Sequence, residues 1–154
     1  MRGQYTATIE CTSVTTAHTL MQILAPAAVN VRLVSATVTN ISNATNQQQL
    51  ECLLTRITSG GNNSAGTSVT PTKSEAGDQS SGCTVLGQLT TEPTTYAAVN
   101  IDDQGFYSLS SYNYQPMPEA RPLIAAATYV GLKLNTAPSA STNFAVEISW
   151  IEEG

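Results

Sequence analysis

The segment QYTATIEC, residues 4–11, alternates strictly between polar and apolar side chains. The apolar side chains fall at every second position, namely Tyr5, Ala7, Ile9 and Cys11. A period of two residues is typical of a β-strand with one buried face. This segment therefore predicts a strand that covers a core on one side and meets solvent on the other.

The same pattern recurs along the chain. It predicts further strands at residues 19–25, 29–41, 50–58, 83–90, 95–101, 106–115, 123–135 and 143–152. Within residues 29–41 the apolar positions change parity between Leu33 and Val34, which predicts a β-bulge near residues 33–35. No segment shows a capped helical period over ten or more residues.

These strands predict an all-β fold, a single-domain jelly-roll-like β-sandwich of about eight or nine strands over residues 1–154. An up-and-down barrel is the less favoured alternative, because several connections are too long for hairpins. We expect residues 59–82, rich in Gly, Ser and Asn, to form a long surface loop. Residues 102–105 are expected to form a turn, and residues 116–122, with three prolines, an extended connection.

The composition is poor in charge. Charged residues make up 11% of the 154 residues, and the formal net charge is −5. The six basic residues are scattered: Arg2, Arg32, Arg56, Lys73, Arg121 and Lys133. Nucleic-acid binding needs several cations on one face, so we expect no nucleic-acid partner. The sequence shows neither a signal-peptide core nor the roughly 18 apolar residues of a membrane helix, so we expect cytoplasmic synthesis and no membrane partner.

The cysteines and the histidine form no recognisable site. Cys11, Cys52 and Cys83 lack CxxC or Cys/His spacing, which argues against zinc and favours buried free thiols, with a disulfide between neighbouring strands as the alternative. His18 stands beside no nucleophile motif.

Acidic residues likewise match no catalytic or metal-binding motif. The calcium candidates do not have the spacing of a calcium loop: Glu75, Asp78, Asp102 and Asp103. Glu92 and Glu119 show no sign of the cleft that a pair of catalytic carboxylates requires. We therefore expect no enzyme activity, no metal and no cofactor. The Asn40, Asn43 and Asn62 sequons are interpreted as chance matches in an Asn- and Thr-rich chain.

Aromatic residues crowd into one uncharged segment. The candidate interface residues are Phe106, Tyr107, Tyr112 and Tyr114. They either fill one end of the sandwich or form an interface, where Tyr and Phe are enriched. Trp150 alternates with core residues and is expected to be buried.

Several phrases in succession carry a resemblance to a known group. They are TLMQILAPAAVNVRLV (19–34), LLTRITSGG (53–61), VTPTK (69–73), TTEPT (90–94) and AVEISWIEEG (145–154). This succession resembles small virion structural proteins of tailed bacteriophages. The resemblance implies a jelly-roll-like protein on the capsid exterior that stabilises the head, often as a trimer, with the major capsid protein as its partner.

That resemblance transfers no catalytic or contact residues. From the sequence itself, residues 1–6 and the loop at residues 59–82 are our candidates for ordering on a neighbouring subunit. Two other classes stay open: a tail- or fibre-associated receptor- or glycan-binding module, and a small secreted hydrolase.

Overall fold

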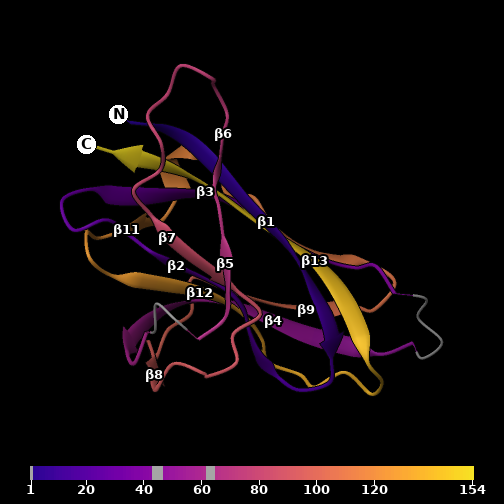
Figure 1. Ribbon diagram of the computed structural model, residues 1–154. Coiled ribbons are helices and arrows are strands. Elements are labelled where there is room, and N and C mark those ends of the chain that lie inside the picture. The colour runs from indigo at the N-terminus through magenta and orange to yellow at the C-terminus, as the bar shows by residue number, and fades with distance from the viewer. Residues whose placement is uncertain (1, 43–46, 62–64) are drawn as a thin grey trace.

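Two antiparallel β-sheets pack face to face in the computed structural model, which describes residues 2–42, 47–61 and 65–154 (Figure 1). In sheet A the strand order is β10 (Ser111–Tyr114), β3 (Asn30–Asn40), β13 (Thr142–Glu153), β1 (Gly3–Val14) and β6 (Thr72–Lys73), and β11 (Leu123–Ile124) also pairs with β3. In sheet B it is β5 (Thr67–Val69), β7 (Thr84–Gly87), β2 (His18–Leu24), β12 (Tyr129–Leu134), β4 (Gln49–Ser59) and β8 (Thr95–Tyr96), and β9 (Asp102–Tyr107) also pairs with β4. The predicted β-sandwich is confirmed.

The core lies between the sheets and follows the predicted alternation. Inward side chains of β13 are fully or almost fully buried: Phe144, Val146, Ile148 and Trp150. The Tyr5 and Trp150 rings pack with their centroids 6.1 Å apart. The burial of Trp150 is therefore confirmed, and β13 forms the centre of sheet A between β3 and β1.

The predicted bulge in β3 is present. Leu33 lies opposite Trp150 and Ser35 lies opposite Ser149, so Val34 is an extra residue between two regular pairs. One extra residue restores the inward direction for Ala36 and Val38, which are both buried.

The expected turn at residues 102–105 is wrong. These residues belong to β9, which pairs with β4 from Gln49 opposite Tyr107 to Leu54 opposite Asp102. Asp and Gly favour turns locally, but six consecutive pairs along the edge of β4 outweigh that preference. The Tyr112 hydroxyl also donates to Asp102 Oδ2 at 2.8 Å and fixes the first residue of the strand.

The expected long loop at residues 59–82 contains two short strands. β5 joins sheet B and β6 joins sheet A, so the chain passes from one sheet to the other between Val69 and Thr72. The described residues hold thirteen strands rather than eight or nine, because four of them are only two or three residues long. The segment near 116–122 is irregular as expected, with a single 3-10 turn at Pro118–Ala120.

A buried carboxylate ties this connection to both chain ends. Glu152 has a side-chain exposure of 0% and lies 3.6 Å from Arg2 Nη1. It accepts hydrogen bonds from the Ser81 hydroxyl at 2.5 Å and the Gly82 N–H at 2.9 Å. The segment before β7 is thereby fixed against β1 and β13.

The outer faces of the two sheets differ. Residues 88–97, here called the covering segment, cross sheet B from Leu89, whose N–H donates to Thr19 O, to β8 on the edge of β4. As a result, Thr55 and Ile57 of β4 are buried although they point away from the core. On sheet A the outward side chains of β1 remain half-buried or exposed.

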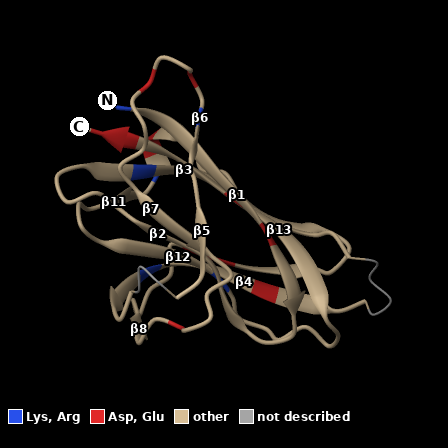
Figure 2. Cartoon of the chain, in the orientation of Figure 1, with Lys and Arg blue, Asp and Glu red and all other residues tan. Residues whose placement is uncertain are grey.

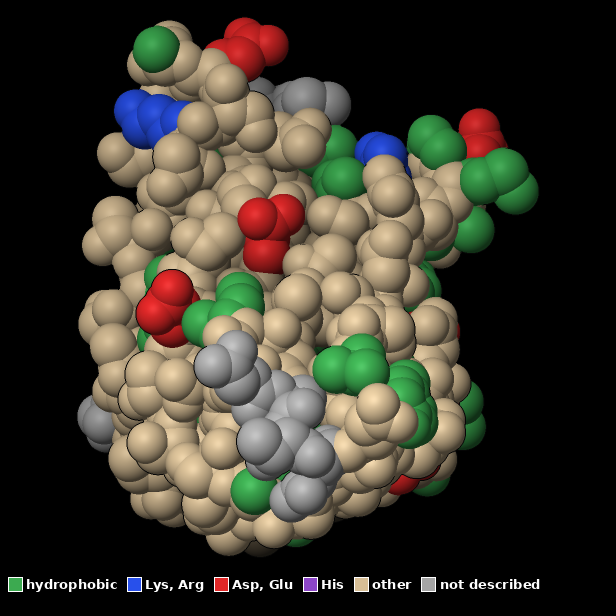
Figure 3. Space-filling model, turned by 90° about the vertical axis from the view of Figure 1, so that its right-hand side faces the viewer, with side chains coloured by type: hydrophobic (Ala, Val, Ile, Leu, Met, Phe, Trp, Pro, Cys, Tyr) green, Lys and Arg blue, Asp and Glu red, His purple; other side chains and the backbone are tan. Residues whose placement is uncertain are grey.

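Uncharged polar groups dominate the surface. Figure 3 shows one side of the molecule on which they predominate, with charged groups scattered and hydrophobic side chains in small separate groups. The described chain contains no helix of the length and hydrophobicity that crossing a membrane requires.

Candidate functional site

The aromatic segment does not form one surface. Phe106 and Tyr112 belong to the core, with exposures of 5% and 0%, because their positions on β9 and β10 face the opposite sheet. Burial, together with the hydrogen bond to Asp102, raises the pKa of Tyr112. Only Tyr107 and Tyr114 reach the surface, so of the two alternatives Phe106 and Tyr112 fill the end of the sandwich, and the interface role stays a prediction for Tyr107 and Tyr114.

Tyr107 lies at one corner with other exposed apolar residues. Its hydroxyl donates to Gln47 Oε1 at 3.0 Å. Leu109 is exposed in the adjoining turn, and Ile41 is exposed directly after β3. The Asn40 side chain at the end of β3 donates a hydrogen bond to Ser108 O and so holds the strand end against that turn. This corner is small and carries no charge of its own.

Glu92 and His18 both make hydrogen bonds to groups around the start of β2. Glu92 accepts hydrogen bonds from the Thr19 N–H at 2.6 Å, the Thr19 hydroxyl at 2.9 Å and the Tyr96 hydroxyl at 2.5 Å. These bonds hold the covering segment on sheet B, and burial together with Glu92 raises the pKa of Tyr96. His18 Nδ1 lies 3.1 Å from Thr16 O in the adjoining turn.

The acidic candidates lie in two separate places, with Asp102 and Asp103 on β9 and Glu75 and Asp78 in the segment after β6. Asp103 stands beside Glu51, and desolvation followed by that charge raises its pKa. Asp78 lies on the far side of the chain, where its carbonyl accepts from Lys73 Nζ at 2.6 Å. Among the described residues, no three His, Cys, Asp or Glu side chains form a group that could hold a metal ion.

All three cysteines are free and buried. Burial raises the pKa of the Cys11 thiol to about 11 and also raises the pKa values of Cys52 and Cys83. The prediction of buried free thiols is confirmed. Asn40 lies on β3, and the Asn43 and Asn62 sequons fall outside the described residues.

One strand edge is left open on β1. At one end, β6 pairs only with Tyr5 and Thr6. At the other end, the Gln88 side chain binds the backbone of Thr12, accepting from its N–H at 3.1 Å and donating to its carbonyl at 2.6 Å. Alternate residues of a strand point their backbone groups to the same side. Thr8 and Glu10 therefore direct their N–H and C=O groups outward, without a hydrogen-bond partner among the described residues.

A shallow hollow of about 430 Å³ lies beside this edge, on the outer face of sheet A. Its lining residues are Thr8, Ile9, Glu10, Thr37, Thr39, Ala145, Val146 and Glu147. Glu10 and Glu147 make it acidic, and no basic residue lines it. The open edge and the hollow together form a polar surface on which an extended peptide could lie.

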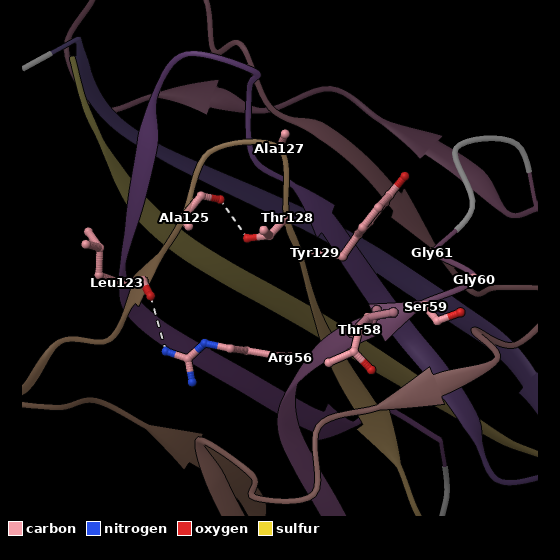
Figure 4. Close-up of a pocket in the computed structure, with 11 residues that line it drawn as sticks. Arg56, Thr58, Ser59, Gly60, Gly61, Leu123, Ala125, Ala127, Thr128 and Tyr129 are labelled. Carbon is pink, nitrogen blue, oxygen red and sulfur yellow. Dashed lines mark hydrogen bonds between the residues drawn. The ribbon is translucent and has the colours of Figure 1, made fainter.

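A second, larger pocket of about 530 Å³ lies where β4 extends past the start of β12; it is here called the Arg56 pocket (Figure 4). Its walls are the end of β4, Gly60 and Gly61, Leu123 of β11, and the turn before β12. Arg56 is its only charged lining residue, and one guanidinium nitrogen donates to Leu123 O at 3.2 Å.

Sequence reasoning did not identify the open edge or the Arg56 pocket. The edge depends on how short β6 is, which no residue pattern shows. The pocket did leave a signal, because Arg56 continues the inward positions Leu50, Cys52 and Leu54 of the same strand. A cation at an inward position marks the place where the space between two sheets opens to solvent. No family model, curated protein or solved structure matches the chain.

Proposed function

We propose that this protein is a non-enzymatic structural component of a tailed-phage particle that decorates and stabilises the capsid exterior as a symmetric oligomer, with a trimer favoured. Its partner in this proposal is the major capsid protein. The observation that carries the proposal is the open edge of β1, since an exposed strand edge binds an extended segment of another chain through main-chain hydrogen bonds. Thr8 and Glu10 supply two donors and two acceptors for such a segment.

The strand order supports the finer assignment to a jelly roll. β1, β13, β3 and β10 lie side by side in one sheet, and β2, β12, β4 and β9 in the other. Eight strands divided in this way between two facing sheets are the arrangement of a double Greek key. The additional short strands extend its edges.

The charge pattern supports a role in assembly. Main-chain hydrogen bonds and uncharged side chains depend little on ionic strength, whereas exposed ion pairs are screened by salt. A chain with 11% charged residues and a hydroxyl-rich sheet face can therefore bind a neighbour under varied ionic conditions.

Particle stoichiometry tests the role directly. Particles purified from the source lysate are analysed by quantitative mass spectrometry, normalised to the major capsid protein. The proposal expects about one copy per capsid subunit. A few copies per particle would instead support the tail- or fibre-associated glycan-binding module, which the Arg56 pocket favours, and absence from the particle would exclude both virion roles.

A proline substitution tests the contact. Thr8→Pro removes the outward N–H and places a ring on the open edge, so incorporation into particles should fall at least about tenfold, the equivalent of one or two hydrogen bonds. Thr8→Val changes the same side chain but keeps the N–H, and it should be incorporated like the wild type. Equal incorporation of both variants would exclude strand addition at β1.

A further inference from the structure

Arg56 differs from Arg2 and Arg32 because its charge is not neutralised by a carboxylate. The ion pairs among the described residues are Arg2 with Glu152 and Arg32 with Glu153. Arg56 forms none, and the hydrogen bond from its Nη2 to Leu123 O leaves its other donors free. That bond fixes the guanidinium at the side of the pocket formed by β11 (Figure 4).

Backbone forms much of the opposite wall. A Cβ on Gly61 would lie 2.7 Å from the Tyr129 ring, so the chain passes directly over the ring. Gly60 has a φ of +70°, and a Cβ there would collide with Thr94. Tyr129 projects toward Gly61, away from Arg56, and the pocket extends between the two (Figure 4).

The turn before β12 is held in a fixed shape. The Thr128 hydroxyl donates to Ala125 O at 2.6 Å, and the Ala127 N–H donates to Pro26 O at 3.0 Å. Ala127 adopts a φ of +57°, a conformation that is unfavourable for a residue with a Cβ and that persists only where the surroundings impose it. The pocket is thus largely formed before any ligand arrives.

The local charge contrasts with that of the whole chain. Three arginines surround β11. Arg32 lies opposite Leu123 in the strand pair, the Arg56 guanidinium donates to the Leu123 carbonyl, and Arg121 lies two residues before Leu123. Two acidic groups lie nearby, of which Glu153 binds Arg32 and Glu119 lies in the 3-10 turn. Counted over these five side chains, β11 has one more positive than negative charge around it, in a chain of net charge −5. Figure 2 shows the Lys and Arg residues scattered along the chain among Asp and Glu.

We propose that the Arg56 pocket binds a carboxylate-bearing monosaccharide. The Arg56 guanidinium binds the carboxylate, since its planar donors match the two oxygens. The methyl groups of Ala125 and Ala127 face the C–H groups of the sugar ring. Ser59 contributes a hydroxyl for the sugar hydroxyls, and the Thr58 hydroxyl, which already donates to Thr95 O at 3.3 Å, has lone pairs left to accept one. The volume of about 530 Å³ lies within the range of small-molecule sites, roughly 300–1,000 Å³.

Calorimetric titration of the isolated protein tests this site. The probes are glucuronate and N-acetylneuraminate as the two acidic sugars, glucose as the neutral sugar, and N-acetylalanine as a carboxylate on a peptide. At least one acidic sugar should bind more tightly than glucose and N-acetylalanine. Equal binding of glucose, tighter binding of N-acetylalanine, or no binding of either acidic sugar would overturn the proposal.

Three variants identify the pocket. Arg56→Met should weaken binding of the acidic sugar at least about tenfold, the effect of losing a charge-assisted hydrogen bond. Arg56→Lys, which keeps the charge but not the planar donors, should fall between. Lys73→Met removes the same charge from β6, away from the pocket, and should bind like the wild type. Wild-type affinity in Arg56→Met would place the ligand elsewhere.

This inference does not depend on the proposed capsid role. Sugar binding is measured on the isolated protein, whereas the capsid role is measured by incorporation into particles. Arg56 is exposed, so Arg56→Met should keep the wild-type melting temperature and be incorporated normally. If one proposal fails, the measurement for the other can therefore still succeed: sugar binding can be lost without any change in incorporation, and incorporation can be lost without any change in sugar binding.

Discussion

At the scale of single residues, the informative side chains are charged ones at positions where the alternation demands an apolar residue. Glu152 follows Phe144, Val146, Ile148 and Trp150 on the inward face of β13, and it is fully buried. A buried carboxylate is costly unless it is hydrogen-bonded and paired. Glu152 meets that requirement through Ser81, Gly82 and Arg2.

Replacing Glu152 tests how much this arrangement stabilises the fold. Glu152→Gln keeps the size of the side chain but loses the charge that strengthens these bonds, so the free energy of unfolding should fall by about 2 kcal/mol. Urea denaturation measures this change. Glu153→Gln at the neighbouring position, where the carboxylate is 37% exposed, should have a much smaller effect. Equal losses in the two variants would mean that burial adds nothing to the Glu152 interactions.

Much of the core could be predicted at this scale, and the reason is the two-residue period. Tyr5, Phe144 and Trp150 are buried as their positions indicate. The partners of Glu152 and Arg56 could not be predicted, because Ser81 and Leu123 lie about seventy residues away in the sequence from the side chains they contact. Alternation identifies the face of a strand but carries no information about what the opposite sheet presents there.

At the scale of elements, β1 combines a fully paired edge with a partly open one. Its pairing with β13 runs from Gly3 to Cys11, whereas its other neighbour, β6, contributes two residues. The long strands and the bulge in β3 could be predicted from parity. The two-residue strand β6 could not, because Thr72 and Lys73 carry no apolar alternation, whereas β8 lies within the strand predicted at residues 95–101 and ends at Tyr96.

Proline at two adjacent positions of β1 tests this difference between the edges. Proline has no N–H to donate to a sheet. Thr8→Pro loses only an N–H that has no partner, whereas Ile9→Pro loses one that points toward β13. We expect Thr8→Pro to remain close to the wild type in free energy of unfolding and Ile9→Pro to lose about 3 kcal/mol or more. Urea denaturation of both variants measures this, and a larger loss in Thr8→Pro would show that the outward edge of β1 is paired.

At the scale of the whole molecule, one core joins the two sheets, while only sheet B is covered on its outer face. The covering segment buries Thr55 and Ile57 from outside, whereas the outer face of sheet A meets solvent across β1, β13 and β3. The sandwich class followed from the strand pattern. The unequal cover did not, because the strand patterns at residues 83–90 and 95–101 carry no information about which sheet face the chain between them crosses.

The three cysteines report whether the sandwich unfolds as one unit. Cys11 lies in sheet A, Cys52 lies in sheet B, and Cys83 precedes β7. Because all three thiols are buried and burial raises their pKa values, the native protein should not react with an alkylating reagent at pH 8. As urea increases, all three should become reactive in the same transition, measured by mass spectrometry of the labelled chain. Labelling of one cysteine ahead of the others would mean that part of the sandwich opens independently.

The pairing of β1 with β13 also decides where anything attached to this chain would emerge. The Arg2 N–H donates to Glu152 O at 2.9 Å, and the two chain ends lie side by side (Figure 1). Peptides joined to both ends would leave the molecule from one corner. Each peptide would therefore be present at a high effective concentration around the other. A short linker could close the chain into a ring, and new ends opened in a distant turn would give a circular permutant with the same sandwich.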